Sequence, residues 1–525
     1  MEYIFTNGTI LTMDPGTASP EAVLVRDNLI AEIGNLASCK AAAKKTAKII
    51  DLKSKVLLPA FTDTHTHFVE LSKRKVMVDL SSCQSLEDVR GYLLRYRETH
   101  AASCSWILGS GWNKNIYPDR QGLTKRFLDQ IFPDIPVALQ SKDYHSKWCN
   151  SLALKIAGLD EASINPFGGI IEKDKNGVPT GILYEKAAEL IDPHVVMPDK
   201  ELLKDAIRRT IEEVYSLGLC GIHSMEPDHS WSLLSEVSNE GSSFRFCWHF
   251  PLDDLDSMIQ KGVKSYTGDE RLKMGGVKIF ADGALGSQTA WMFDPFSNSA
   301  TNTGVMRYTD AQLLEIATKA ASHGIAVTIH AIGNRCVHQV LSTIFKINTL
   351  YPSSGLMHRI EHVQSIRKQD YSLLQASRAY CALQPVHLSN DIPLIEAYWN
   401  NITEQAYPFH DLLQLDIPYG FGSDVPIETI NPFLGIYTAL ERKHALNQYR
   451  PSWMPKQKID LASTLYGYTL GAAQGSCSEA VRGSITKGKL ADLMVLEDFF
   501  ELPNEYWLKA KSLLTMVDGK IVHQV

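Results

Sequence analysis

Residues 57–67 read LLPAFTDTHTH and place an apolar run directly before two histidines. A short run of this kind predicts a buried β-strand. Residues i and i+2 of a strand point the same way, so the side chains of His65 and His67 converge on one point. Two converging imidazoles are what a divalent metal needs from a protein. Two polar residues at the end of a strand would give the same pattern, so metal binding and a structural role both stay open here.

Toward the C-terminus, apolar strand-like runs alternate with amphipathic helical runs. A helix is expected at 200–217, before a strand at 220–223 that ends in His223. A second helix is expected at 310–323, before a strand at 325–330. Such alternation, continued over roughly 400 residues, predicts a parallel α/β architecture.

The two ends of the chain differ from this middle part. The first fifty-odd residues and the last forty read as short strands separated by turns, typical of a small β-sandwich or β-roll. Chain termini often lie close together, so the two ends can pair into one domain. The block from about 70 to 200 fits the alternation poorly, and we interpret it as a mixed α/β insertion.

Composition narrows the function classes. The chain has 525 residues, of which 44% are hydrophobic and 21% charged, and a net charge of −7. This excludes disordered, collagen-like and coiled-coil proteins and predicts no nucleic-acid or membrane partner. No apolar stretch is long enough for a membrane span, and the N-terminus does not read as a signal peptide. The nine cysteines are scattered without a C-x-x-C pair, so we expect a cytoplasmic protein.

Lys278 lies within the apolar stretch GVKIFADG at 276–283. A lysine inside a buried strand is costly unless it is paired or neutralised. On an edge strand the side chain would simply reach solvent. Alternatively, the lysine is reactive, and its carboxylation by CO₂ would give an anionic carbamate able to bridge two metals.

Three more polar residues follow strand-like runs. His330 ends the run 327–330, and His362 ends a run about thirty residues later. Asp424 ends the run that begins at Pro418. A lone histidine of this kind is more often structural, and a lone aspartate is often a helix cap. In an eight-stranded barrel, however, the C-terminal strand ends form the active site. A carboxylate there can bind metal or accept the proton of a metal-bound water.

At this point the sequence resembles the metal-dependent amidohydrolase superfamily, and within it the YtcJ-like branch, amidohydrolase family 3. The resemblance spans nearly the whole chain, from NGTILTMD at 7–14 to GKLADLMVL at 488–496. Five motifs lie between these two in the family's order: PAFTDTHTH at 59–67, VKIFADGALGS at 277–287, IHAIGN at 329–334, RIEHVQ at 359–364 and GSDVP at 422–426.

The resemblance implies a distorted (β/α)₈ TIM barrel over residues 57–479, with the insertion at about 70–200. It also implies a composite β-sandwich domain built from residues 1–56 and 480–525. The implied metal ligands are His65, His67, Lys278, His330, His362 and Asp424. Lys278 is the lysine that family members carboxylate, and two metals per chain are expected if it is modified. Zinc is the expected metal, although manganese, iron, cobalt and nickel suit the same ligands.

The insertion also carries a family pattern. Residues 143–154 read DYHSKWCNSLAL, similar to D-G-H-x-x-W-x-N-S-x-A-L, with Tyr144 where glycine is usual. Residues 221–226 carry serine where the family has aspartate. His145 and His223 are therefore candidates for polarising or orienting the substrate, and structural roles are equally open. Trp112 and Tyr144 are expected either as pocket walls or as packing residues.

The predicted function is hydrolysis of an amide-like C–N bond, other than a peptide bond, in a small molecule. A metal-bound hydroxide would attack the carbonyl carbon, and Asp424 would pass the water proton to the leaving nitrogen. One alternative is a mononuclear metal-dependent deaminase of a heterocycle. Another is a barrel that has lost catalysis and only binds a partner. The expected partner is a small-molecule substrate, and a homodimer is the default assembly.

Overall fold

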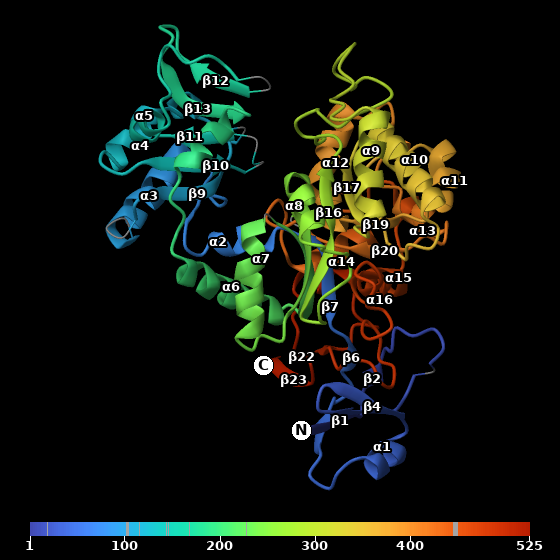
Figure 1. Cartoon of the computed structure of the whole chain (residues 1–525). Helices are drawn as coiled ribbons and strands as arrows, with labels where there is room; N and C mark the ends of the chain where they lie inside the picture. Colours follow the sequence, from blue (N-terminus) through green and yellow to red (C-terminus); the bar gives the residue numbers. More distant parts are fainter. Residues whose placement is uncertain are drawn as a thin grey trace. The chain divides into compact units, whose positions relative to one another are not determined.

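The computed structural model describes residues 1–17, 19–100, 104–114, 116–142, 144, 146–166, 169–226, 228–444 and 450–525. The chain divides into two compact units (Figure 1). The first unit comprises residues Met1–Phe68 and Thr210–Val525, and the second comprises Val69–Arg209. Each unit is described by itself.

An eight-stranded parallel sheet forms the centre of the first unit. Its strands, in spatial order, are β20 (Tyr419–Phe421), β19 (Tyr380–Leu383), β18 (Arg359–His362), β17 (Val327–Ala331), β16 (Leu272–Phe280), β15 (Arg245–Pro251), β14 (Leu219–Met225) and β7 (Phe61–Thr66). The first and last strands meet through two backbone bonds of 2.7 Å: Asp424 N–H donates to His65 O, and His67 N–H donates to Val425 O. The prediction of an α/β barrel is confirmed.

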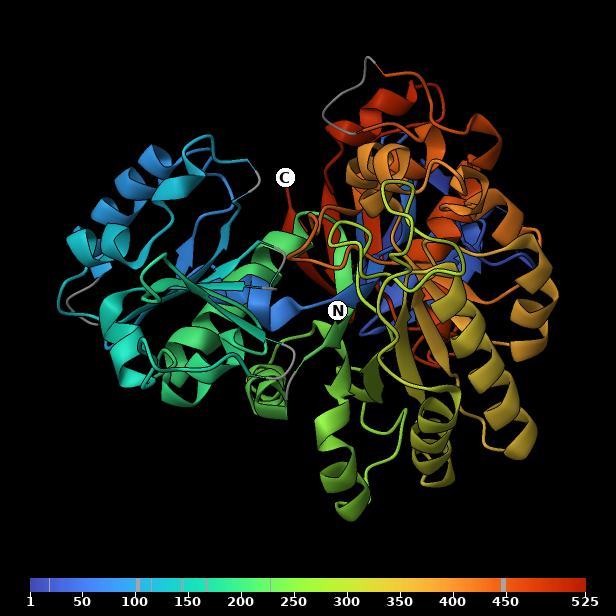
Figure 2. The same cartoon turned by 90° about the horizontal axis from the view of Figure 1, so that it is seen from above.

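Helices surround these strands, as the view from above shows for the yellow and orange part of the chain (Figure 2). They are α7 (Asp228–Asn239), α8 (Leu255–Gln260), α9 (Asp310–Ser322), α10 (Asn334–Leu350), α11 (Tyr371–Ser377), α12 (Pro385–Tyr398), α13 (Phe409–Leu413), α14 (Pro432–Glu441), α15 (Leu461–Tyr468) and α16 (Leu470–Gln474). Because helices cover their outer sides, the parallel strands are buried almost continuously, and every residue of β7 and β14 is buried. A capping box of Thr309 and Gln312 starts α9.

Both ends of the chain contribute to a second part of this unit, where blue and red strands lie side by side (Figure 1). One sheet contains β1 (Glu2–Thr6), β3 (Ala22–Arg26), β4 (Leu29–Gly34) and β5 (Lys48–Asp51), with α1 (Leu36–Ala42) beside it. The other contains β2 (Thr9–Ile10), β6 (Val56–Pro59), β21 (Leu493–Leu496), β22 (Leu514–Val517) and β23 (Lys520–Gln524). One apolar cluster joins residues from both ends, including Phe5, Val23, Leu57, Leu493 and Met516. The more specific prediction of a β-sandwich stays a prediction.

The second unit is itself α/β. Its six-stranded sheet runs in the order β12 (Gly169–Lys173), β13 (Pro179–Glu185), β11 (Ser146–Cys149), β10 (Val137–Ser141), β9 (Ile107–Trp112) and β8 (Val78–Asp79). Its helices are α3 (Leu86–His100), α4 (Lys125–Ile131) and α5 (Ser151–Ile156), while α2 (Phe68–Lys73) and α6 (Lys200–Tyr215) connect the units along the chain.

Trp112 is a core residue of the second unit. It packs edge-to-face on Trp148 at 6.1 Å between ring centroids, and its indole N–H donates to the carbonyl of Leu139 at 2.8 Å. Of the two roles left open for Trp112, packing is the one observed. Among the residues that the structure describes, no helix is both long and apolar enough to cross a membrane.

Candidate metal centre

The C-terminal ends of the barrel strands bring the six predicted ligands together. His65 Nε2 lies 3.2 Å from Lys278 Nζ and 3.4 Å from Asp424 Oδ1. His67 Nε2 also lies 3.4 Å from Asp424 Oδ1. The ring of His362 is 4.8 Å from that of His65 between centroids, and the ring of His330 is 4.5 Å from that of His362. Within this cluster, His65, His67 and Asp424 form one group with metal-binding spacing.

Three of the histidines present Nε2 to the cluster. Their Nδ1 atoms face acceptors: the carboxylate of Glu361 at 2.5 Å for His65, the carbonyl of Met225 at 2.8 Å for His67, and the amide oxygen of Gln384 at 2.9 Å for His362. Since these partners accept hydrogen bonds, each Nδ1 carries the proton and each Nε2 keeps its lone pair. The histidines are therefore oriented as metal ligands.

His330 is oriented the other way. Its Nε2 lies 3.2 Å from the carbonyl oxygen of Gly283, so the proton belongs on Nε2. Its Nδ1 is buried and has no hydrogen-bond partner among the described residues. A buried nitrogen with a free lone pair is costly unless a ligand occupies it. This atom, together with the imidazole and carboxylate groups around it, fits a bound divalent metal.

Burial favours the neutral form of three of the four imidazoles; for His67 burial is outweighed by the Asp424 carboxylate, which raises its pKa. Burial lowers the pKa of His65 and His362 well below the usual value, and lowers that of His330 to about 3. Neutral imidazole is the form that binds metals. Burial also lowers the pKa of Lys278 to about 8, although Glu361 and Asp424 oppose the shift. Burial opposes ionisation of Asp424, but the surrounding histidines hold its pKa well below the usual range.

The buried carboxylate of Asp63 ties two ligand segments together. Its Oδ1 accepts the backbone N–H groups of His65 and Ser423, each at 3.0 Å. Asp424 itself has a left-handed backbone with φ of 59°, and His362 has φ of 76°. Such conformations are costly outside glycine and persist where surrounding contacts impose them. Asp63 supplies such contacts next to Asp424. Sequence reasoning assigned no role to Asp63, although it stands two residues before His65.

His387 is the functional candidate that sequence reasoning missed. It lies in the first turn of α12, and its Nε2 is 3.3 Å from Asp424 Oδ2, without hydrogen-bond geometry. His362, His387 and Asp424 form a second group with metal-binding spacing. Burial opposes protonation, yet the Asp424 carboxylate raises the pKa of His387 to about 9. The available signal was its place four residues after the buried strand β19.

The other two predicted catalytic residues do not join this cluster in the described contacts. His223, on β14, is fully buried, and its Nδ1 receives a hydrogen bond of 2.7 Å from Arg359. His145 lies outside the described residues. Its neighbour Tyr144 lines a cavity of about 420 Å³ in the second unit, together with Gln140 and Glu185. That Tyr144 forms a wall of the substrate pocket stays a prediction.

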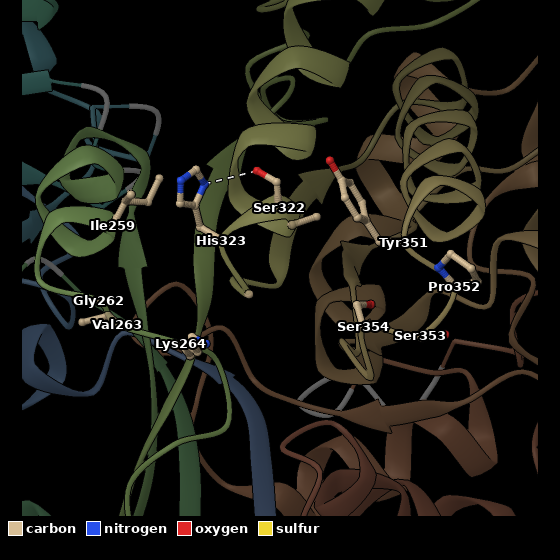
Figure 3. Close-up of a pocket in the computed structure, with 12 residues that line it drawn as sticks. Ile259, Gly262, Val263, Lys264, Ser322, His323, Tyr351, Pro352, Ser353 and Ser354 are labelled. Carbon is tan, nitrogen blue, oxygen red and sulfur yellow. Dashed lines mark hydrogen bonds between the residues drawn. The ribbon is translucent and has the colours of Figure 1, made fainter.

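A wider hollow of about 690 Å³ lies elsewhere in the first unit (Figure 3). Residues 262–264, 323–324 and 351–354 line it, and each of these segments precedes a barrel strand. The hollow therefore lies at the N-terminal end of the strands, opposite the histidine cluster. Its one histidine, His323, contacts Ser322 Oγ at 3.2 Å and the carbonyl of Lys319 at 2.8 Å. None of the predicted site residues lines it.

A parallel α/β barrel with imidazole and carboxylate groups at its C-terminal strand ends defines the class of metal-dependent barrel hydrolases. The model of the Amidohydrolase family matches residues 48–523, and the chain belongs to this family. The family resemblance of the sequence motifs is thereby confirmed, and the protein is a hydrolase.

Individual relatives agree with this assignment. The chain is 31% identical to YtcJ of Bacillus subtilis (strain 168), named as an amidohydrolase, over 535 residues that cover 100% of both proteins. It is 24% identical to the N-substituted formamide deformylase of Arthrobacter pascens, covering 100% of this chain and 98% of that one. Among solved structures, a metal-dependent hydrolase from Pyrococcus horikoshii is similar, with a TM-score of 0.80 and 25% identity. That match covers 96% of this chain and 99% of the other.

Proposed function

We propose that this protein hydrolyses an amide-like C–N bond, other than a peptide bond, in a small molecule. The observation that carries the proposal is the position of Asp424, within 3.4 Å of the Nε2 atoms of His65 and His67. The site thus combines a carboxylate with the lone pairs of imidazole nitrogens at the C-terminal end of the barrel strands, where barrel enzymes have their active sites. The choice of bond draws support from the relative named as an N-substituted formamide deformylase.

The metal would be held by His65, His67, His330, His362, Asp424 and the modified Lys278. When bound, a divalent metal supplies a Lewis acid that polarises a carbonyl oxygen and lowers the pKa of a water molecule in the site to about 7. Zinc is our first choice because neutral imidazole and carboxylate ligands suit it.

Asp424 acts as the general base. As the water oxygen forms its bond to the carbonyl carbon, a carboxylate oxygen of Asp424 accepts the water proton. When the C–N bond breaks, the same proton passes to the leaving nitrogen, which departs as a neutral amine. His67 and His387 flank the carboxylate on its two oxygens and hold it in place. Catalysis by a positioned acid–base group contributes typically about 10²–10⁴-fold.

Lys278 is carboxylated in the active protein. Its neutral amine attacks CO₂, a new N–C bond forms, and one proton leaves, so that an anionic carbamate results. Two observations support this step: Lys278 is buried, and its Nζ lies 3.2 Å from the ligand atom of His65. An ammonium group there would repel a metal cation, whereas a carbamate offers it two oxygens.

The remaining features of the proposal come from the sequence. The protein acts in the cytoplasm on a small molecule, without nucleic-acid or membrane partners, and forms a homodimer. His145 and His223 orient the substrate, and the paired chain ends form a β-sandwich beside the barrel.

The test is metal-dependent hydrolysis. Protein purified with added zinc and bicarbonate is analysed for metal per chain, then assayed on a panel of N-formyl and N-acyl amines before and after chelation. We expect activity on part of the panel, its loss on chelation and its recovery with zinc. Full metal loading without hydrolysis of any amide would overturn the proposal and favour a binding protein.

A mononuclear deaminase is the second candidate. It would need no modified lysine, because His65, His67 and Asp424, which bind metals unmodified, already lie at metal-binding spacing. Release of ammonia from amino-substituted heterocycles by protein with one metal per chain would support it over amide hydrolysis.

A further inference from the structure

Arg359 and Glu361 form an ion pair that is fully buried inside the barrel. They stand two residues apart on β18, so their side chains share the inward face. Arg359 Nε lies 2.9 Å from Glu361 Oε1, Arg359 Nη2 lies 3.2 Å from Glu361 Oε2, and both side chains are 0% exposed. Burying two charges is expensive, and apolar residues of similar volume often give equal stability. Such a pair therefore points to a role other than stability.

The carboxylate side of the pair holds a metal ligand. Glu361 Oε2 accepts the Nδ1 proton of His65 at 2.5 Å. Arg359 Nη2 also donates to the backbone carbonyl of Thr64 at 2.7 Å. The pair thus contacts His65 twice, through its ring and through the peptide before it. Because a carboxylate can only accept, His65 must keep its proton on Nδ1 and its lone pair on Nε2.

The guanidinium side faces a different histidine. Arg359 Nη1 donates to Nδ1 of His223 at 2.7 Å and to the carbonyl of Gly475 at 3.3 Å. A guanidinium can only donate, so Nδ1 of His223 accepts and its proton lies on Nε2. His223 therefore lacks the outward-facing lone pair that His65 offers.

We propose that the Arg359–Glu361 pair is a positioning device that sets the tautomers of two buried histidines of this barrel, His65 and His223. His65, on the carboxylate side, becomes a ligand. His223, on the guanidinium side, presents an N–H group and stays off the metal. The metal in this inference rests on the proposed function. The tautomers of His65 and His223 are expected whether or not a metal is bound.

The charge of Glu361 is needed as well as its shape. All five N–H groups of Arg359 have acceptors, two of them on Glu361. In a Glu361→Gln variant, one carboxylate oxygen becomes an NH₂ group. That group would face either the guanidinium or Nδ1 of His65. Facing Nδ1, it would force the His65 proton onto Nε2 and remove the ligand; facing Arg359, it would oppose another donor.

Zinc affinity tests the device. Apparent affinity for zinc, measured by competition with a chromophoric chelator, is compared between the parent, Glu361→Gln and the conservative Glu361→Asp. We expect roughly 10–100-fold weaker binding in Glu361→Gln, as for other partners of metal-bound histidines, and a smaller loss in Glu361→Asp.

Asp492→Asn is the matched control, because it removes one partner of an equally buried pair, Arg245–Asp492, and leaves every described contact of the histidines in place. It should lose stability without losing zinc affinity.

Nitrogen-15 spectra of the histidine rings provide a second readout on the folded, metal-free protein. We expect His65 as the Nδ1–H tautomer and His223 as the Nε2–H tautomer, with assignments made from His65→Ala and His223→Ala. Parent-like zinc affinity in Glu361→Gln, or His223 as the Nδ1–H tautomer, would overturn the inference. If the parent itself binds no zinc while both tautomers are as expected, the proposed function fails and the setting of the two tautomers stands.

Discussion

Arg245 and Asp492 form a two-pronged ion pair although they are 247 residues apart. Arg245 Nε lies 2.6 Å from Asp492 Oδ2, and Arg245 Nη2 lies 2.7 Å from Asp492 Oδ1. Arg245 begins barrel strand β15, and Asp492 directly precedes β21 in the sheet built from both chain ends. Asp492 also accepts the backbone N–H of Asp518 at 2.9 Å. The aspartate of the GKLAD motif therefore fastens the terminal sheet to the barrel.

Asp492→Ala should destabilise the protein by about 3–5 kcal/mol, because it leaves a buried guanidinium without its counter-charge. Urea unfolding of the parent and the variant measures the difference. Glu497→Ala is the comparison, since it removes a half-exposed partner of Lys55 at 3.3 Å. That variant should lose no more than about 1 kcal/mol. Equal losses in the two variants would contradict the fastening role.

Lys278→Ala should lower the metal content of protein made with zinc and bicarbonate. Without the carbamate the second metal loses a ligand, so about two metals per chain should fall to about one. Elemental analysis of both proteins measures the ratio. About one metal in the parent and in the variant would rule out bridging by Lys278 and favour the mononuclear site.

Asp424→Asn should abolish most of the turnover on any amide that the parent hydrolyses. An amide side chain cannot accept the water proton, so kcat should fall by roughly 10²–10⁴-fold. Steady-state kinetics on metal-loaded protein gives the value, and elemental analysis shows whether the variant still holds metal. A variant that retains metal and keeps its kcat would exclude Asp424 as the base.

His358 should make stability depend on pH. Burial lowers the pKa of His358 to about 4, and its Nδ1 accepts the backbone N–H of Val327 at 3.1 Å. The unfolded chain, with a pKa near 6.5, therefore binds more protons between about pH 6.5 and 4. The contribution of neutral His358 is complete above this window and is lost as pH falls through it, by up to about 3 kcal/mol.

The variant His358→Asn keeps an acceptor for Val327 and removes the titrating ring. Urea unfolding of both proteins at several pH values across the window should give a parent that weakens more steeply than the variant as the solution is acidified. Parallel curves would show that His358 titrates normally in the folded protein.

The strand-end residues could be predicted because their signals are local. A polar residue that closes an apolar run, as His330 and His362 do, indicates the C-terminal end of a strand without any knowledge of distant contacts. His387 escaped prediction because it lies one helical turn beyond its strand. Glu361 escaped because its role depends on His65, and this contact across the barrel leaves no trace in spacing.

Other features depended on packing alone. Trp112 fitted a pocket wall and a buried core equally well, because an aromatic residue in a short apolar run serves either purpose. The pairing of β6 with β21 joins segments more than 400 residues apart, and only the similar character of the two ends and the family resemblance pointed to it. The clamp between Arg245 and Asp492 had no signal beyond the motif that contains Asp492.

The pairing of β6 with β21 also sets an order of events during synthesis. A ribosome adds about 5–20 residues per second, so roughly 20–90 s pass between the synthesis of β6 and that of β21. Throughout that interval the apolar edge of β6 has no neighbour from the C-terminal segment, and β7, with His65, follows it directly along the chain. An unpaired apolar edge invites association with other nascent chains. The first strands of this protein therefore stay open to such association until β21 has been made.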